Sequence, residues 1–171
     1  MPMGVRWFVG VIEKINRLFI LLASVGTVLI MCLVVMAVAS RATGEPLIWP
    51  YDVAQFVLVY VFFLGLAPAL ESGHHIGVEL FDTFVPPLIR PAVAYIASTL
   101  IILFGAVLLF QLWRTTSRAF GDGRMSIQTI AIPLKWIYVI GPIGTIQFIL
   151  TELSLLARHC WREENGGISV N

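Results

Sequence analysis

Four long stretches of this chain are apolar on every helical face, and most polar residues lie between them. The stretches cover residues 18–40, 53–70, 92–113 and 136–157, and the first three contain no Asp, Glu, Lys, Arg or His. A helix of about 20 residues crosses the roughly 30 Å hydrocarbon layer, whereas strands of a membrane barrel alternate apolar and polar residues. The pattern therefore predicts an all-α integral membrane protein with four membrane-spanning helices.

Two segments beside these stretches have the pattern of amphipathic helices. In residues 5–17 polar positions recur at spacings of four, three and four. In residues 76–85 Leu80, Phe81 and Phe84 share one face. Both segments are predicted to be interfacial helices in the headgroup plane; alternatively, each continues the neighbouring spanning helix. Residues 164–171 are expected to form a flexible tail.

The tryptophans provide a separate test of the span boundaries, because the indole ring favours the interface between lipid and water. None of the five lies in the middle of a span: they are Trp7, Trp49, Trp113, Trp136 and Trp161. The first stretch ends in Ala37-Val38-Ala39, which is typical of a signal-peptide cleavage site, but its length exceeds the usual apolar region of about 7 to 15 residues. We therefore expect a retained first helix.

Composition agrees with a membrane protein and excludes several functions. Hydrophobic residues make up 58% of the chain and charged residues only 12%, about half the charged share of ordinary soluble domains. The net charge of +1 provides no basic field for nucleic acid. Lys and Arg divide almost equally between the two sides, so charge bias alone does not orient the protein. Only the early cluster of Arg6, Lys14 and Arg17 favours termini in the cytoplasm.

Reactive and ionisable side chains are scarce within the predicted spans. Glu152 is the one charge inside a span, and we expect it at the membrane boundary or paired across a helix contact; an ion or proton site is the alternative. Gly141 and Pro142 together with Gly144 predict a kink or a close helix approach, with a discontinuous substrate-binding helix as the alternative. Since no nucleophile has a base at suitable spacing, we predict no catalytic, substrate-binding or metal-ligating residues.

Short motifs follow one another in a recognisable order. They are the segment from Arg41 through Trp49 to Asp52, Phe63-Leu64-Gly65, the run from Gly73 to Leu80, Ile132-Pro133-Leu134-Lys135-Trp136-Ile137-Tyr138, and Pro142-Ile143-Gly144. This order resembles the small membrane (Q) subunit of tripartite ATP-independent periplasmic (TRAP) transporters. Asp52 and Glu79 each replace one acid of the family pattern by the other. Glu71 reverses the sign of a position that is often Arg, which changes the headgroup or partner residue expected there.

The resemblance implies a non-catalytic permease subunit in the bacterial inner membrane, with both termini in the cytoplasm. Its expected partners are a large multi-span M subunit, which carries the substrate and sodium sites, and a periplasmic substrate-binding protein that delivers an organic acid. We expect this chain to brace the M subunit during sodium-coupled uptake. No cofactor is expected in this chain, although a bound phospholipid is compatible with it. The identity of the organic acid would be set by the other polypeptides.

The candidate interaction residues fall into two groups. Those expected at contacts with the partner subunit or within the chain are Arg41, Trp49, Asp52, Glu71, His74, His75, Glu79, Trp136 and Glu152. Of these, Arg41 and Asp52 are expected to pair with each other or with the M subunit. The outer loop is basic, and its charges are expected either to dock the binding protein or to contact lipid headgroups; they are Arg114, Arg118, Arg124 and Lys135.

Two other functions are alternatives to a TRAP permease subunit. A haem- or quinone-associated membrane anchor of an oxidoreductase would need histidines at matching depth on facing helices. The adjacent His74 and His75 point in different directions, so at most one of them could serve as such a ligand. A small self-sufficient exporter is the other alternative, and the lack of an acid in the middle of the membrane disfavours it.

Overall fold

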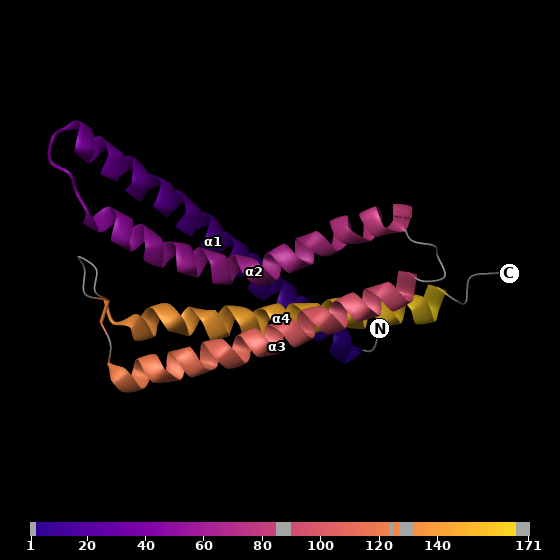
Figure 1. The fold of residues 1–171 in the computed structure, drawn as a ribbon. Helices are drawn as coiled ribbons and strands as arrows, with labels where there is room; N and C mark the ends of the chain where they lie inside the picture. Colours follow the sequence, from indigo (N-terminus) through magenta and orange to yellow (C-terminus); the bar gives the residue numbers. More distant parts are fainter. Residues whose placement is uncertain (1–2, 85–89, 124, 127–131, 167–171) are drawn as a thin grey trace.

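Four long helices make up the fold in a computed structural model of the chain, which describes residues 3–84, 90–123, 125–126 and 132–166. Side chains are described except at residues 3, 73–84, 90–92, 94, 159–160 and 162–166. The helices are α1 (Met3–Ala42), α2 (Trp49–Phe84), α3 (Arg90–Asp122) and α4 (Leu134–Gly166) (Figure 1). Each contains a segment long and apolar enough to cross a membrane, which confirms the predicted fold class.

The helices extend beyond the apolar stretches that predicted them. α1 begins at Met3 and runs without a break through residues 5–17 into the first stretch. α2 continues to Phe84, so residues 76–84 are helical and belong to the same element as the second stretch. Both segments therefore continue their spanning helices, as in the alternative, and their position at the membrane interface stays a prediction. Residues 164–166 close α4 rather than beginning a tail, and residues 85 and 167–171 lie outside the described residues.

Local chemistry explains where the hairpins turn. Gly44 follows α1 with φ of 85°, and Gly123 follows α3 with φ of 59°. This left-handed conformation is costly for residues with a Cβ atom and favours glycine after a helix. The hydroxyl of Ser40 accepts a hydrogen bond of 3.1 Å from the Leu47 amide and thereby fixes the first turn. The α1–α2 and α3–α4 turns lie at one end of the molecule, called here the loop end, and both termini lie towards the other end (Figure 1).

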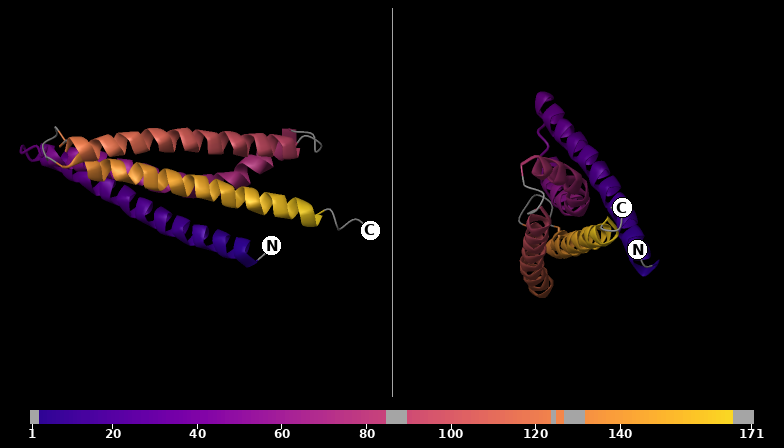
Figure 2. Two further views of the ribbon diagram at one scale, coloured as in Figure 1. Left: turned by 90° about the horizontal axis from the view of Figure 1, so that it is seen from below. Right: turned by 90° about the vertical axis from the view of Figure 1, so that its right-hand side faces the viewer.

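The helices do not surround a common centre. α4 packs against both α2 and α3 and makes a smaller contact with α1. Figure 2 shows the four helices from the end. Of the residues in the most apolar window of each helix, 61% are buried in α4 but only 11% in α1 and in α3. α4 is thus the central helix, while α1 and α3 present wide apolar faces outward. Such faces suit lipid or the apolar surface of another membrane chain.

Glycine permits the closest helix contact. A Cβ atom added at Gly144 in α4 would lie 2.4 Å from the carbonyl oxygen of Phe63 in α2. Because that oxygen belongs to the backbone, no side-chain rotation can relieve the clash. The close approach predicted at Gly144 is therefore confirmed. Pro142 lies inside α4, which remains one helix, so the alternative of a discontinuous helix is not supported.

Candidate functional site

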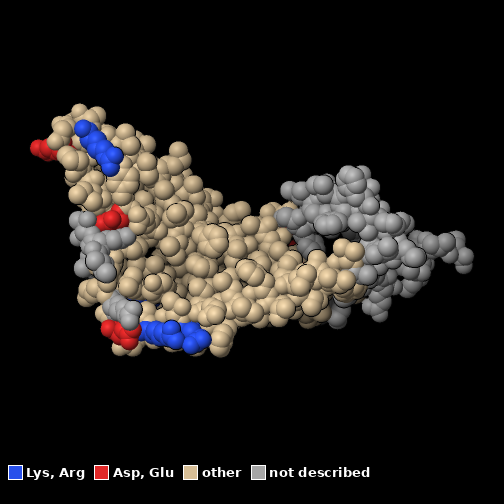
Figure 3. All heavy atoms as spheres, viewed as in Figure 1, with Lys and Arg blue, Asp and Glu red and all other residues tan. Residues whose placement is uncertain are grey.

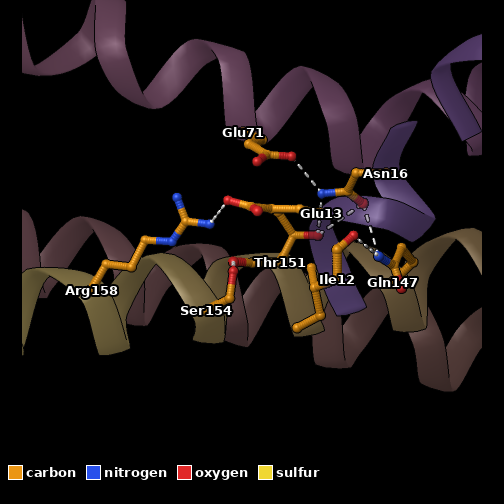
Figure 4. A network of polar contacts seen from close by, with 8 residues as sticks. All are labelled: Ile12, Glu13, Asn16, Glu71, Gln147, Thr151, Ser154 and Arg158. Atoms are coloured by element: carbon orange, nitrogen blue, oxygen red, sulfur yellow. Dashed lines mark hydrogen bonds and ion pairs between the residues drawn. The ribbon is translucent and has the colours of Figure 1, made fainter. Parts of the chain in front are cut away.

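Asn16 is the centre of a buried polar network where α1 crosses α2 and α4 (Figure 4). Only 2% of Asn16 is exposed. Its Nδ2 donates to Oε2 of Glu71 in α2 at 2.8 Å and to Oγ1 of Thr151 in α4 at 3.1 Å. Its Oδ1 accepts from Nε2 of Gln147 in α4 at 2.8 Å. One amide thus joins three helices.

The network satisfies polar groups that lipid could not. Thr151 is fully buried and Gln147 is 5% exposed, so neither side chain can rely on water for hydrogen bonds. Gln147 also lies 3.5 Å from the carbonyl oxygen of Ile12, and Ser154 donates to the carbonyl of Thr151 at 2.7 Å. In membranes such side chains hold helices together, because leaving them without partners in hydrocarbon is costly. The network is suited to fixing the helices, and its polar atoms are engaged with one another rather than directed at a solute.

An ion pair extends the contact between α1 and α4 towards the ends of the helices. The guanidinium of Arg158 donates to the carboxylate of Glu13 (Figure 4). Their side chains remain 35% and 40% exposed, respectively. Solvent therefore screens the attraction, and the pair is expected to contribute about 0.2–1 kcal/mol.

Reversing one charge of this pair is expected to weaken the α1–α4 contact. Glu13→Arg or Arg158→Glu alone should lower the free energy of unfolding in detergent by up to about 1 kcal/mol, because two like charges then face each other. The double variant should regain most of that loss. Unfolding of the four proteins of this double-mutant cycle provides the measurement, and additive losses in the double variant would contradict a direct pair.

Glu152 lies inside the helix packing, and its expected position at the membrane boundary stays a prediction. Its side chain is 0% exposed, and within the described part of the chain neither carboxyl oxygen has a hydrogen-bond partner. It shares a face of α4 with Gly141 and Phe148, which lie against Leu112 and Gly105 of α3. Glu152 is therefore directed towards the α3–α4 contact, on a different face from the Asn16 network.

Charged residues near the α1–α2 turn were predicted to form contacts, and one such contact is present. The Arg41 guanidinium lies over the Tyr51 ring, 5.1 Å from its centroid, which is within the range of a cation–π interaction. Trp49 begins α2 and is 38% exposed, while Asp52 lies in the first turn of that helix. The pairing of Arg41 with Asp52 or with a partner subunit stays a prediction.

The predicted basic residues lie at the α3–α4 turn. Arg114 and Arg118 are exposed in the last turns of α3, and the Arg114 guanidinium lies 5.7 Å from the centroid of Phe110. The Lys135 ammonium lies 5.9 Å from the centroid of Trp136, whose carbonyl accepts a 2.6 Å hydrogen bond from the Tyr60 hydroxyl. Figure 3 shows charged side chains of both signs at the loop end of one face.

Several predicted residues cannot be placed in these contacts. The backbone of His74, His75 and Glu79 belongs to α2, but their side chains lie outside the described residues, as does Arg124. Among the described residues, no group of three His, Cys, Asp or Glu side chains could hold a metal ion. Of the candidates described, the structure joins Glu71 to the polar network and places Arg41, Trp49, Asp52, Arg114, Arg118, Lys135 and Trp136 near the loop end.

Asn16 and its partners on α4 are not among the residues predicted from the sequence. A usable signal was present, because Gln147, Thr151 and Ser154 recur at spacings of four and three and therefore share one helical face. The span in α4 is also the least hydrophobic of the four. A polar stripe along a spanning helix indicates contact with another helix rather than with lipid. The position of Asn16 opposite that stripe could not be read from the sequence.

These features define a class: a helical integral membrane protein whose described interior polar groups mainly join its own helices. The profile of the family "Tripartite ATP-independent periplasmic transporters, DctQ component" matches residues 30–161. Because the match covers most of the chain, the protein belongs to this family of TRAP transporter components. Membership confirms the resemblance seen in its motifs and identifies a transporter component.

A curated relative shows how this chain compares with a longer permease. The chain is 27% identical over 115 residues to the sialic acid TRAP transporter permease protein SiaT of Haemophilus influenzae (strain 86-028NP). The matched region covers 67% of this chain but 18% of the relative. The matched region therefore spans less than a fifth of the length of that permease.

Proposed function

We propose that this protein is the small permease subunit of a TRAP transporter and braces a large M subunit during binding-protein-dependent uptake of an organic acid. The observation that carries the proposal is the match of the DctQ-component family to residues 30–161. In this proposal the large M subunit carries the substrate and sodium sites. The engagement of Asn16, Gln147 and Thr151 with one another supports this division of work.

The fold supports a bracing role. α4 is held by the other three helices, while α1 and α3 present apolar faces on either side. This arrangement widens the membrane footprint of any subunit bound to it. Trp7, Trp113 and Trp136 are between 61% and 74% exposed, and indole rings at the membrane interface resist displacement along the membrane normal. A transport domain of the M subunit could therefore move against a scaffold fixed in the bilayer.

Uptake is expected to require both permease chains. Cells that produce the binding protein and the M subunit without this chain should take up substrate only at the background level, because the scaffold is incomplete. Radiolabelled uptake in a transporter-deleted strain measures this, with expression of the M subunit confirmed in its membrane. Full uptake by the M subunit without this chain would contradict the bracing role.

The basic residues at the loop end are proposed to help dock the binding protein electrostatically. Arg114→Gln together with Arg118→Gln should raise the concentration of binding protein needed for half-maximal uptake by about tenfold at low salt. The difference should shrink as ionic strength rises. Lys14→Gln, an exposed change far from the loop end, is the control. If the apparent affinity for the binding protein changes neither with the Arg substitutions nor with ionic strength, the result would favour contact of these residues with lipid headgroups instead.

Location and orientation follow from the same proposal. We propose that the chain spans the bacterial inner membrane with both termini in the cytoplasm and the loop end in the periplasm. This orientation places Arg114 and Arg118 where a periplasmic protein can reach them. Family membership gives no support to a haem- or quinone-associated anchor, and an absorption spectrum without a Soret band would agree with its exclusion.

A further inference from the structure

A groove between α1 and α2 opens where the apolar part of α2 ends. Its volume is about 260 Å³, and its lining residues are Asn16, Arg17, Ile20, Pro68, Glu71 and Ser72. The apolar stretch of α2 covers residues 53–70 and ends directly before Glu71, so the groove lies at the end of that stretch, away from the loop end. This is the depth at which lipid headgroups meet a membrane protein.

The groove presents one acid and one base. Glu71 is fixed in place because its Oε2 accepts the 2.8 Å hydrogen bond from the buried amide of Asn16. The other lining charge is Arg17, which is exposed on α1. Within the described part of the chain no ion pair of 4.0 Å or less joins Arg17 to Glu71. The groove therefore presents both signs of charge to a ligand that carries a positive and a negative group.

The rest of the groove is suited to an acyl chain. Ile20 and Pro68 lie about one turn nearer the apolar middle of their helices than Arg17 and Ser72. Ile20 is 53% exposed. A Cβ atom added at Gly65, further along α2, would meet nothing within 4 Å. The lining thus changes from charged to apolar in the direction of the membrane centre.

We propose that this groove binds a zwitterionic phospholipid with a primary amine headgroup. Its ammonium would donate to the Glu71 carboxylate, its phosphate would lie at the Arg17 guanidinium, and one acyl chain would follow Ile20 and Pro68. A headgroup with a phosphate but no amine leaves Glu71 without a positive partner. A quaternary choline has no N–H to donate. The pairing of charges and the depth of the groove therefore favour phosphatidylethanolamine over phosphatidylglycerol or phosphatidylcholine.

Lipid retention by the purified full chain tests this assignment. The protein is placed in nanodiscs of equimolar phosphatidylethanolamine and phosphatidylglycerol, and the lipids that remain bound after release into the gas phase are counted by mass spectrometry. The unchanged protein should retain phosphatidylethanolamine about tenfold over phosphatidylglycerol, the ratio that corresponds to one charge-assisted hydrogen bond. Equal retention of the two lipids would overturn the proposal.

Three variants examine the groove, and one leaves it intact. Glu71→Gln should abolish the preference for phosphatidylethanolamine, yet its amide oxygen can still accept from Asn16 and preserve the fold. Arg17→Gln should reduce retention of that lipid, since the phosphate loses its partner. Ser72→Leu should block the groove by size, because Ser72 bonds only to Ala69 of its own helix among the described residues. Glu45→Gln removes one negative charge, as Glu71→Gln does, but from an exposed loop residue, and should leave lipid retention unchanged.

A basic side chain from a partner subunit is the competing occupant. If Glu71→Gln leaves lipid retention by the chain unchanged, the lipid assignment is wrong. It is also wrong if, in a separate purification of the complex, the only effect of Glu71→Gln is release of the large subunit. Because the lipid measurement uses this chain alone, its outcome is independent of whether the chain supports uptake. Failure of the lipid proposal and failure of the bracing role can therefore be distinguished.

Discussion

Gly144→Ala is expected to lower the free energy of unfolding in detergent by about 1–3 kcal/mol, the usual cost of overpacking. The added methyl group would lie 2.4 Å from the Phe63 carbonyl oxygen and 2.9 Å from the Phe63 Cβ. α2 and α4 must separate to accept it, and that separation also loosens the helices that pack against them. Unfolding by increasing fractions of a denaturing detergent, followed by circular dichroism, measures the change.

A matched control exists in the neighbouring helix. Gly65→Ala in α2 makes the same chemical change at a position where nothing lies within 4 Å of the new methyl group. Its effect should be near zero or slightly stabilising, because alanine favours helix over glycine. Similar losses in the two variants would show that α2 and α4 do not approach as closely as described. A larger residue, as in Gly144→Leu, is expected to prevent accumulation of the folded protein.

Asn16→Leu is expected to cost about 1–3 kcal/mol through loss of the polar network. The substitution retains approximate size but removes both the donor to Glu71 and the acceptor for Gln147. Gln147 then keeps only its 3.5 Å contact with the Ile12 carbonyl in α1, and Thr151 loses its partner in that helix. The loss should appear both in unfolding and as weaker crosslinking between cysteines introduced on the facing sides of α1 and α4.

Ser24→Ala provides the comparison for Asn16→Leu. Ser24 is an exposed polar residue of the same helix, and its hydroxyl bonds at 2.8 Å to the carbonyl of Ile20 in its own helix. Its replacement should change the free energy of unfolding by less than about 0.5 kcal/mol. Equal effects of the two substitutions would mean that the bonds from Asn16 to α2 and α4 contribute little beyond helix propensity.

The two variants address different contacts of the same central helix. Gly144 governs how closely backbones approach, whereas Asn16 fixes which faces meet. A variant that weakens either contact is also expected to impair uptake if the brace must be rigid. If a variant has a lower free energy of unfolding but normal uptake, function depends on the outward faces of α1 and α3 rather than on these two contacts.

Some details of the fold were accessible from the sequence and others were not. The apolar stretches predicted the four helices, and Gly144 predicted a close contact. The sequence did not reveal that residues 5–17 would be continuous with the first span, because an amphipathic segment is compatible with either arrangement. Glu71 is a predicted interaction residue because it departs from the family pattern. Its partner Asn16 is not, since a single amide within an otherwise amphipathic segment has no distinctive spacing.

The sequence by itself determined the environment of the chain, its helical class and its family, because these follow from local composition and from motifs that are read along one dimension. Tertiary structure alone decided that α4 lies at the centre, that Asn16 meets Glu71 and Gln147, and that Glu152 turns towards α3. These contacts join residues more than 50 positions apart in the case of Asn16 and Glu71. Lipid favours any apolar helix face about equally, so only the fit of particular side chains selects which faces meet.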